Sequence, residues 1–220
     1  MVNHYKMPLP ASYFFLYNII MKNLPSTLPV FPLSGVIYFP KTNLPLNIFE
    51  QRYLNLVNDA YNKDKLMGMV QSKKESGSVY QVGCLGKISD YQKSKDGRIL
   101  INLTGISRFK ILEEISNDKL YREFKVDYKD FNEDNIETNN LIDTSLLMDN
   151  AKNFFKRNGL LLNWKEFEKL NQSQKINTLA MIAPITNEEK QKLLESISLK
   201  NKVETLESII SFYLHETNFN

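Results

Sequence analysis

Residues 28–57 read LPVFPLSGVIYFPKTNLPLNIFEQRYLNLV, and this stretch decides the fold. Its prolines stand at positions 29, 32, 40 and 45, each beside apolar residues. Because proline has no N–H to donate to a sheet ladder, it belongs at strand starts, edges and bends. The stretch therefore predicts three short extended segments over residues 28–33, 36–39 and 44–48.

A change of period follows the third segment. Phe49, Tyr53, Val57 and Tyr61 recur at helical spacing, with Leu54 close to the same face. Apolar residues at this spacing indicate an amphipathic helix rather than another strand. The spacing predicts that the first helix of the fold begins near Phe49 and turns this set of side chains to one side.

A second region, residues 82–111, reads as a β hairpin. Asp96-Gly97 stands between two alternating runs, and glycine tolerates the positive φ that short hairpin turns need. After the turn, alternation puts one set of side chains on the buried face of a strand: Ile99, Ile101 and Leu103.

These two regions are similar to the Lon-protease amino-terminal (substrate-binding) domain family. Members open with a Pro-Leu, a hydrophobic-Phe-Pro, a second Pro-Leu and an Arg on the first helix. The matching positions here are Pro32-Leu33, Tyr38-Phe39-Pro40, Pro45-Leu46 and Arg52. The second family signature is a Val-Gly strand, an Asp-Gly-Arg turn and a Gly-x-x-Arg-Phe-x-Ile strand. Its last strand supplies Gly105, Arg108 and Phe109.

The resemblance implies an α+β fold with a PUA-like mixed β pseudo-barrel, a first amphipathic helix and a C-terminal helical bundle. It implies a stand-alone member that lacks the ATPase and protease modules. The Lon-type β domain is expected over residues 24–131. The polar, acidic residues 132–140 are expected to be a linker, and residues 141–217 the helical bundle.

Capping signals mark the helices of this second half. Asn163 is expected to cap a helix that has Glu166 at its third position, and Ser173 to cap the next one. Thr186 and Glu189 have the spacing of a capping box.

Residues 1–23 lie upstream of the first proline-rich strand. They contain an apolar run over residues 13–21, which is shorter than the roughly 20 residues that span a bilayer. We expect a disordered extension, or a start codon assigned too early. A secretory or membrane anchor and a short helix packed on the domain are the alternatives.

Composition indicates a cytoplasmic globular protein. The chain has 220 residues, 42% of them hydrophobic and 24% charged, and a net charge of +3. That charge is too small to imply a nucleic-acid partner. The single cysteine, Cys84, excludes an internal disulfide framework and stands in an apolar strand, where we expect it to be buried. We expect no cofactor, no metal and no membrane partner.

No catalytic constellation is visible in the sequence. None of the eight glycines stands in the Gly-x-x-x-x-Gly-Lys-Ser/Thr frame of an ATPase phosphate loop. The only histidines, His4 and His215, stand at opposite ends of the chain, so a Ser/His/Asp arrangement has no evident base. We expect a non-enzymatic protein, with Arg52 and Arg108 packing their stems and pairing with carboxylates.

The resemblance implies recognition of polypeptide, either unfolded substrates or a protease or chaperone partner. Unfolded chains are recognised by burying their side chains on exposed apolar surface, and helix-start polar groups can bond an extended backbone. The expected site is where the β start meets the first helix: Phe49, Glu50, Gln51 and Arg52.

Two other functions are considered. The Lon-type β domain resembles the PUA fold of RNA-binding proteins, so an RNA-binding module is the alternative. The near-neutral charge and the lack of aromatics interleaved with a basic stripe argue against RNA. An enzyme would need a polar pocket with perturbed titratable groups.

Overall fold

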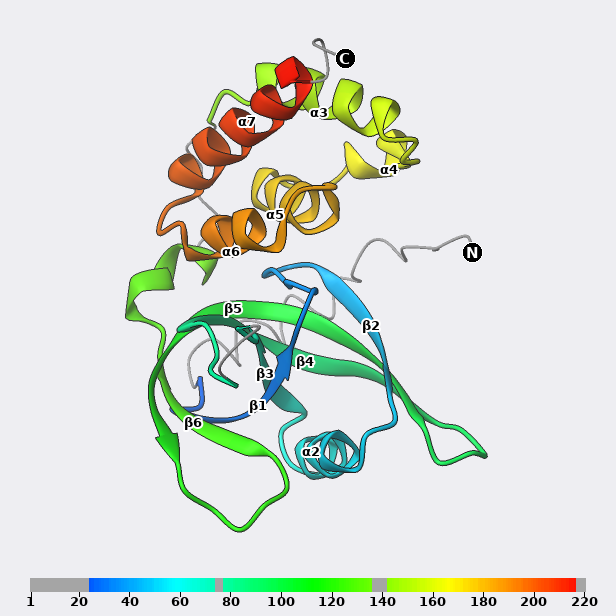
Figure 1. The fold of residues 1–220 in the computed structure, drawn as a ribbon, viewed down its shortest axis with the longest axis vertical. Helices are drawn as coiled ribbons and strands as arrows, with labels where there is room; N and C mark the ends of the chain where they lie inside the picture. Colours follow the sequence, from blue (N-terminus) through cyan, green and yellow to red (C-terminus); the bar gives the residue numbers. More distant parts are fainter. Residues whose placement is uncertain (1–23, 74–76, 136–141, 217–220) are drawn as a thin grey trace.

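The computed structural model describes residues 24–73, 77–135 and 142–216 (Figure 1). The expected extension over residues 1–23 lies outside the described residues, as do residues 136–140 of the expected linker. The strands are β1 (Thr27–Leu33), β2 (Asn43–Ile48), β3 (Leu66–Gln71), β4 (Val82–Lys93), β5 (Ile99–Ile115) and β6 (Arg122–Asp127). The helices are α2 (Gln51–Asn62), the 3-10 helix η1 (Lys129–Asn135), α3 (Ser145–Arg157), α4 (Trp164–Phe167), α5 (Gln172–Ile182), α6 (Asn187–Glu195) and α7 (Leu199–Glu216).

The strands form a mixed sheet that closes on itself. Their order is β2-β5-β4-β3-β1-β6, and a further pairing of β5 with β6 closes the ring. β1 and β3 are parallel, and the other pairs are antiparallel. One edge of β5 pairs with β4, and its other edge pairs first with β2 and then with β6. The predicted α+β class with a β pseudo-barrel is confirmed.

Two glycines, one in the turn between β4 and β5 and one within β5, have structural reasons to be glycine. Gly97 lies in the turn between these strands with φ +87°, as the Asp96-Gly97 hairpin signal predicts. Gly105 lies where β5 passes from β2 toward β6, and a Cβ there would overlap the backbone carbonyl of Phe39. The strand therefore approaches residue 39 more closely than any side chain allows.

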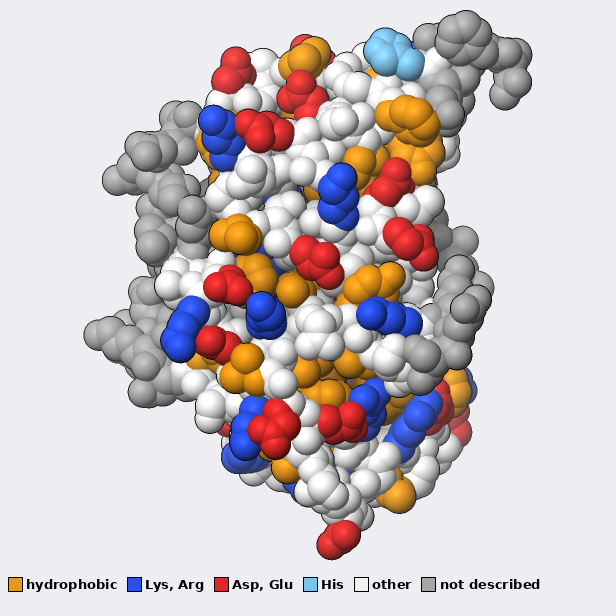
Figure 2. All heavy atoms as spheres, turned by 60° about the vertical axis from the view of Figure 1, so that its left-hand side comes forward, with side chains coloured by type: hydrophobic (Ala, Val, Ile, Leu, Met, Phe, Trp, Pro, Cys, Tyr) orange, Lys and Arg blue, Asp and Glu red, His pale blue; other side chains and the backbone are white. Residues whose placement is uncertain are grey.

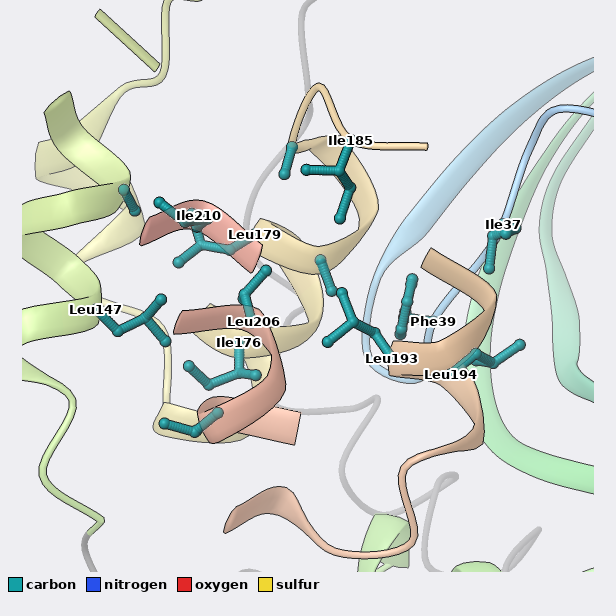
Figure 3. Packing of buried hydrophobic residues seen from close by; sticks show 14 of the residues in the cluster. Ile37, Phe39, Leu147, Ile176, Leu179, Ile185, Leu193, Leu194, Leu206 and Ile210 are labelled. Atoms are coloured by element: carbon teal, nitrogen blue, oxygen red, sulfur yellow. The ribbon is translucent and has the colours of Figure 1, made fainter. Parts of the chain in front are cut away.

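The helical half packs on one end of the barrel through a shared apolar core (Figure 3). Ile37, Phe39 and Val82 from the β half are buried in the same cluster as residues of α3, α5, α6 and α7. Residues 36–39 were expected to be a strand, and this expectation is wrong. They form a loop that directs Phe39 toward Leu193 of α6, so burial against the helices replaces strand pairing.

Two further details of the helices correct the sequence analysis. α2 begins at Gln51, and its buried side chains are Tyr53, Leu56, Val57 and Ala60, so Phe49 precedes the helix and stays exposed. α5 is capped by Asn171, whose side chain accepts the N–H of Gln174, and not by Ser173. The side chain of Gln174 accepts the N–H of Asn171 in return, which completes a capping box. Ser173 cannot be the N-cap, because it already lies inside the first turn of the helix.

The other predicted caps are confirmed. Asn163 accepts the N–H of Glu166, and Thr186 forms a capping box with Glu189. Of the helices that the structure describes, none combines the length and apolar character that crossing a membrane would require.

Candidate functional site

An exposed apolar patch lies on the outward face of β2 and β5. Asn47 pairs with Leu100 in the β2–β5 register, so their side chains share one face, and Pro45 lies on that face two positions earlier. Phe49 continues this alternation directly after β2. The Phe49 and Leu100 side chains are 66% and 43% exposed, and Pro45 is also exposed. We call Pro45, Phe49 and Leu100 the outer patch.

The outer patch contains a residue that the sequence analysis did not select. Leu100 lies opposite Asn47, and Phe49 follows Asn47 by two residues, which makes it the diagonal neighbour of Leu100. Such neighbours lie about 7–8 Å apart across an antiparallel pair, within reach of large side chains. Its signal is visible in the sequence, because Leu100 is the apolar member of an otherwise polar outward face with Asn102 and Thr104. Its position beside Phe49, however, depends on the strand register.

A groove of about 620 Å³, lined by charged, polar and apolar side chains, lies at the start of α2. We call it the mixed-charge groove. Its lining comes from the end of β1, the start of α2, the ends of β5 and β6 and the loop after β3: Pro32, Leu33, Ser34, Glu50, Arg52, Tyr53, Ser72, Gly77, Glu114 and Arg122.

Each arginine of the groove is paired with a glutamate. Arg52 Nη2 lies 2.8 Å from Glu50 Oε2, and its guanidinium lies 4.5 Å from the centre of the Tyr53 ring. Arg122 donates through Nε and Nη2 to the two oxygens of Glu114, both at 2.6 Å. The hydrogen bond with Arg122 lowers the pKa of Glu114. The groove thus offers hydrogen-bond donors and acceptors with little net charge.

The four residues predicted as the polypeptide site are divided between these two surfaces. Phe49 belongs to the outer patch, whereas Glu50 and Arg52 line the mixed-charge groove. The Gln51 side chain donates to Asn55 Oδ1 at 2.8 Å along the exposed side of α2. The predicted site therefore contributes to an apolar surface and to a charged groove.

The predicted family-motif residues lie in several places. Pro32 and Leu33 line the mixed-charge groove, Pro45 is in the outer patch, and Leu46 is half-buried against the barrel core. Gly105 and Phe109 are inside the fold. The carbonyl of Pro40 accepts a hydrogen bond of 3.0 Å from Asn177 of α5.

Arg108 is buried between the two halves. It lies on β5 between the parts that pair with β2 and β6, and its guanidinium forms an ion pair with Asp134 of η1. The guanidinium also donates to the carbonyl of Leu194, in the last turn of α6, and to those of Ser196 and Ile197, between α6 and α7. One side chain from the barrel thus holds η1 and the helical half together.

A second buried cation lies at the same junction. Lys202 of α7 is 2% exposed, its ammonium donates to Asn177 Oδ1 at 2.7 Å, and it lies 5.5 Å from the centre of the Phe39 ring. Burial, with the nearby positive charge of Arg108, lowers the pKa of Lys202 to about 7. Neither Lys202 nor Asp134 was selected from the sequence, since a charged residue in a polar stretch gives no sign of burial.

Charges of both signs are interspersed over the face shown in Figure 2. Blue and red side chains alternate over the helical and the β half of this face, with hydrophobic areas between them. A nucleic-acid surface would gather cations in a stripe. This face has no such stripe among the residues that the structure describes.

The chain matches a protein-family model over most of its length. Residues 27–211 match the model of the ATP-dependent protease La (LON) substrate-binding domain. The match covers both the β half and most of the helical half. It contains the outer patch, the mixed-charge groove and the buried Arg108.

Among curated relatives, the chain is 28% identical over 228 aligned residues to a Lon protease of Syntrophus aciditrophicus, covering 95% of this chain and 28% of that protein. It is 24% identical over 205 residues to a Lon protease of Dictyoglomus thermophilum, covering 88% of this chain and 25% of that protein. The chain therefore spans about a quarter of the length of these relatives.

Two solved structures share the fold. A Lon N-terminal domain protein from Xanthomonas campestris superposes with a TM-score of 0.59 at 20% identity, covering 85% of this chain and 98% of that one. The N-terminal domain of a Mycobacterium avium complex Lon protease superposes with a TM-score of 0.63 at 15% identity, covering 84% and 98%.

Proposed function

Because the chain belongs to the ATP-dependent protease La (LON) substrate-binding domain family, we propose that it binds unfolded polypeptide through the start of α2 and the adjacent outer patch. Family membership supports a substrate-recognition role in general. The finer statement rests on the exposed outer patch. On this proposal the chain binds without carrying out a chemical step, and a protease or chaperone is a second kind of partner.

The outer patch supplies the apolar part of the interaction. An unfolded chain exposes side chains that a folded protein buries, and their transfer from water contributes about 25 cal/mol per Å² of apolar area. Leu100 lies opposite Asn47 in the β2–β5 register, and Phe49 follows Asn47 by two residues at the end of β2. A rigid sheet face can therefore bind without first ordering a loop, which limits the entropy cost of association.

The mixed-charge groove supplies the polar part. Its arginine–glutamate pairs can exchange partners with charged side chains or with the peptide backbone of a bound segment. The groove is lined by Glu50, the residue next to Phe49, so one extended segment can contact both surfaces.

Fluorescence anisotropy tests this proposal with fluorescein-labelled, reduced and carboxymethylated lactalbumin, a permanently unfolded chain. We expect the parent to bind at tens of micromolar or better. A Phe49→Ala, Arg52→Ala variant that is folded by circular dichroism should bind at least about tenfold more weakly. Phe212→Ala is the matched control, because Phe212 is also exposed, at 54%, but lies on α7.

The outcomes separate the parts of the proposal. Equal affinity of the folded double variant and the parent would reject this surface. No binding by the parent would reject polypeptide recognition itself. The RNA-binding hypothesis is tested in parallel with a labelled oligouridine, whose tighter binding than the unfolded chain would favour that alternative. A cytoplasmic location remains a prediction.

A further inference from the structure

The outer patch borders an open strand edge. Within the described residues, β2 pairs with β5 alone, whereas the other strands each have partners on two sides over part of their length. Figure 1 shows β2 at the margin of the sheet, with no strand drawn along its outer side. Both Pro45 and Asn47 of this strand are exposed. Such an edge can accept another extended chain.

The phase of the β2–β5 ladder determines which backbone groups are open. The N–H of Gly105 donates to the carbonyl of Thr42 at 2.9 Å, and the carbonyl of Gly105 accepts the N–H of Lys41, so the Thr42 carbonyl points toward β5. Bonded and non-bonded pairs alternate in an antiparallel ladder. The backbone groups that point away from β5 therefore belong to Asn43, Pro45 and Asn47. This phase also explains how a proline fits in β2, since Pro45 loses no bond to β5.

We propose that the β2 edge binds an extended polypeptide segment as an added strand, which deepens the proposed function and rests on it. The carbonyls of all three residues face outward. Only Asn43 and Asn47 add an outward N–H, because proline has no backbone N–H. An extended chain presents donors and acceptors at the same spacing. Every second side chain of the added strand then lies on the face of the outer patch, next to Phe49.

The edge favours a foreign chain over a second copy of β2. In an antiparallel pair of two β2 strands centred on Pro45, the two prolines would lie opposite each other. Neither proline has a backbone N–H, so both hydrogen bonds between them would be missing. A foreign segment loses only one bond at Pro45. Because main-chain groups are common to all polypeptides, this mode also suits substrates that share no sequence.

Asn47 offers a matched pair of variants. Asn47→Pro removes an outward N–H and leaves the bonds to β5 in place, whereas Asn47→Ala keeps that N–H. With carboxymethylated lactalbumin as the probe, we expect Asn47→Pro to bind about fivefold more weakly and Asn47→Ala to bind within about twofold of the parent. Equal affinities of parent and both folded variants would overturn the added strand while leaving the proposed function standing.

Hydrogen exchange on the unsubstituted protein gives a second measurement that does not depend on the folding of a variant. The amide protons of Asn43 and Asn47 should exchange at least about tenfold more slowly when the same probe is bound. Unchanged exchange at both amides in a saturated complex would overturn the inference. A parent that fails to bind the probe would reject the proposed function. If exchange at these amides slows with rising protein concentration in the absence of the probe, the edge binds a second copy of this chain. That result would overturn the proposal that it binds a foreign strand.

Discussion

Arg108 and Asp134 form an ion pair that is buried between the two halves of the molecule. Arg108 Nη2 lies 2.8 Å from Asp134 Oδ1, and the two side chains are 2% and 6% exposed. Asp134 Oδ2 also accepts the backbone N–H of Arg108 at 2.9 Å, at a point where β5 has no strand partner on that side. The carboxylate therefore satisfies both the side chain and the backbone of the same residue.

Removal of this carboxylate charge should destabilise the fold strongly. Asp134→Asn leaves the buried guanidinium without its counter-charge, so we expect a loss of about 3 kcal/mol in the free energy of unfolding. Urea denaturation measures this loss. The control is Asp130→Asn, since Asp130 pairs at 4.0 Å with the half-exposed Lys110 and should cost below about 0.5 kcal/mol. Equal losses in the two variants would contradict the role given to Asp134.

Lys202 should make stability depend on pH. Its pKa in the fold is about 7, below the ordinary 10.5, so between these values the unfolded chain binds a proton that the folded chain does not. The Lys202 contribution to stability therefore increases as the pH rises from 7 toward 10, with a slope approaching about 1.4 kcal/mol per pH unit. Below pH 7 this contribution is constant.

Lys202→Met isolates the effect. The variant has no amine to desolvate, so the unfolding free energy of the parent should rise relative to that of Lys202→Met between pH 7 and 9. Urea denaturation of both proteins at each pH measures the difference between their unfolding free energies. The contributions of all other titratable groups are common to both proteins and cancel in this difference. A difference that does not change with pH would show that Lys202 titrates at its ordinary value.

Gly105 should not tolerate a side chain. In Gly105→Ala the new Cβ would overlap the carbonyl of Phe39, so we expect a loss of about 3 kcal/mol or a failure to fold. Gly97→Asn is the control, because no atom lies within 4 Å of a Cβ there and asparagine tolerates positive φ. Its loss should stay below about 1 kcal/mol. A Gly105→Ala protein with the parent's thermal midpoint would disprove the close approach.

The chain by itself should not turn over ATP or protein substrates. The sequence has no phosphate-loop glycine frame, and the part matched to the family is its substrate-binding domain. We expect no phosphate release from ATP and no cleavage of casein. Activity that coelutes with the protein through successive columns, and that persists after repurification, would contradict this expectation.

The parts of the fold that local rules control could be predicted from the sequence. Proline positions, the Asp96-Gly97 turn and the capping box of Thr186 and Glu189 each act through residues close in the chain. The resemblance to a family added the order of the elements. The strand predicted for residues 36–39 does not form, because Phe39 packs against helices that are distant in the sequence. No local pattern indicates that contact.

The candidate site was only partly predictable for the same reason. Phe49 and Arg52 are close in sequence and were selected together, yet only Arg52 lines the mixed-charge groove, whereas Phe49 is an exposed apolar side chain outside it. Leu100, Glu114 and Arg122 come near them only through the pairing of β5 with β2 and β6. No local pattern contains that register.

The most direct test of polypeptide recognition at the outer patch is an NMR titration of the isotope-labelled chain with unlabelled carboxymethylated lactalbumin. We predict that amide shifts change at residues 43–52 and 99–102, around Phe49 and Leu100, and that the helical half changes little. Perturbations confined to the exposed face of α3 and α7, around Leu146 and Phe212, or no perturbation at saturating concentrations of the unfolded chain, would contradict the account.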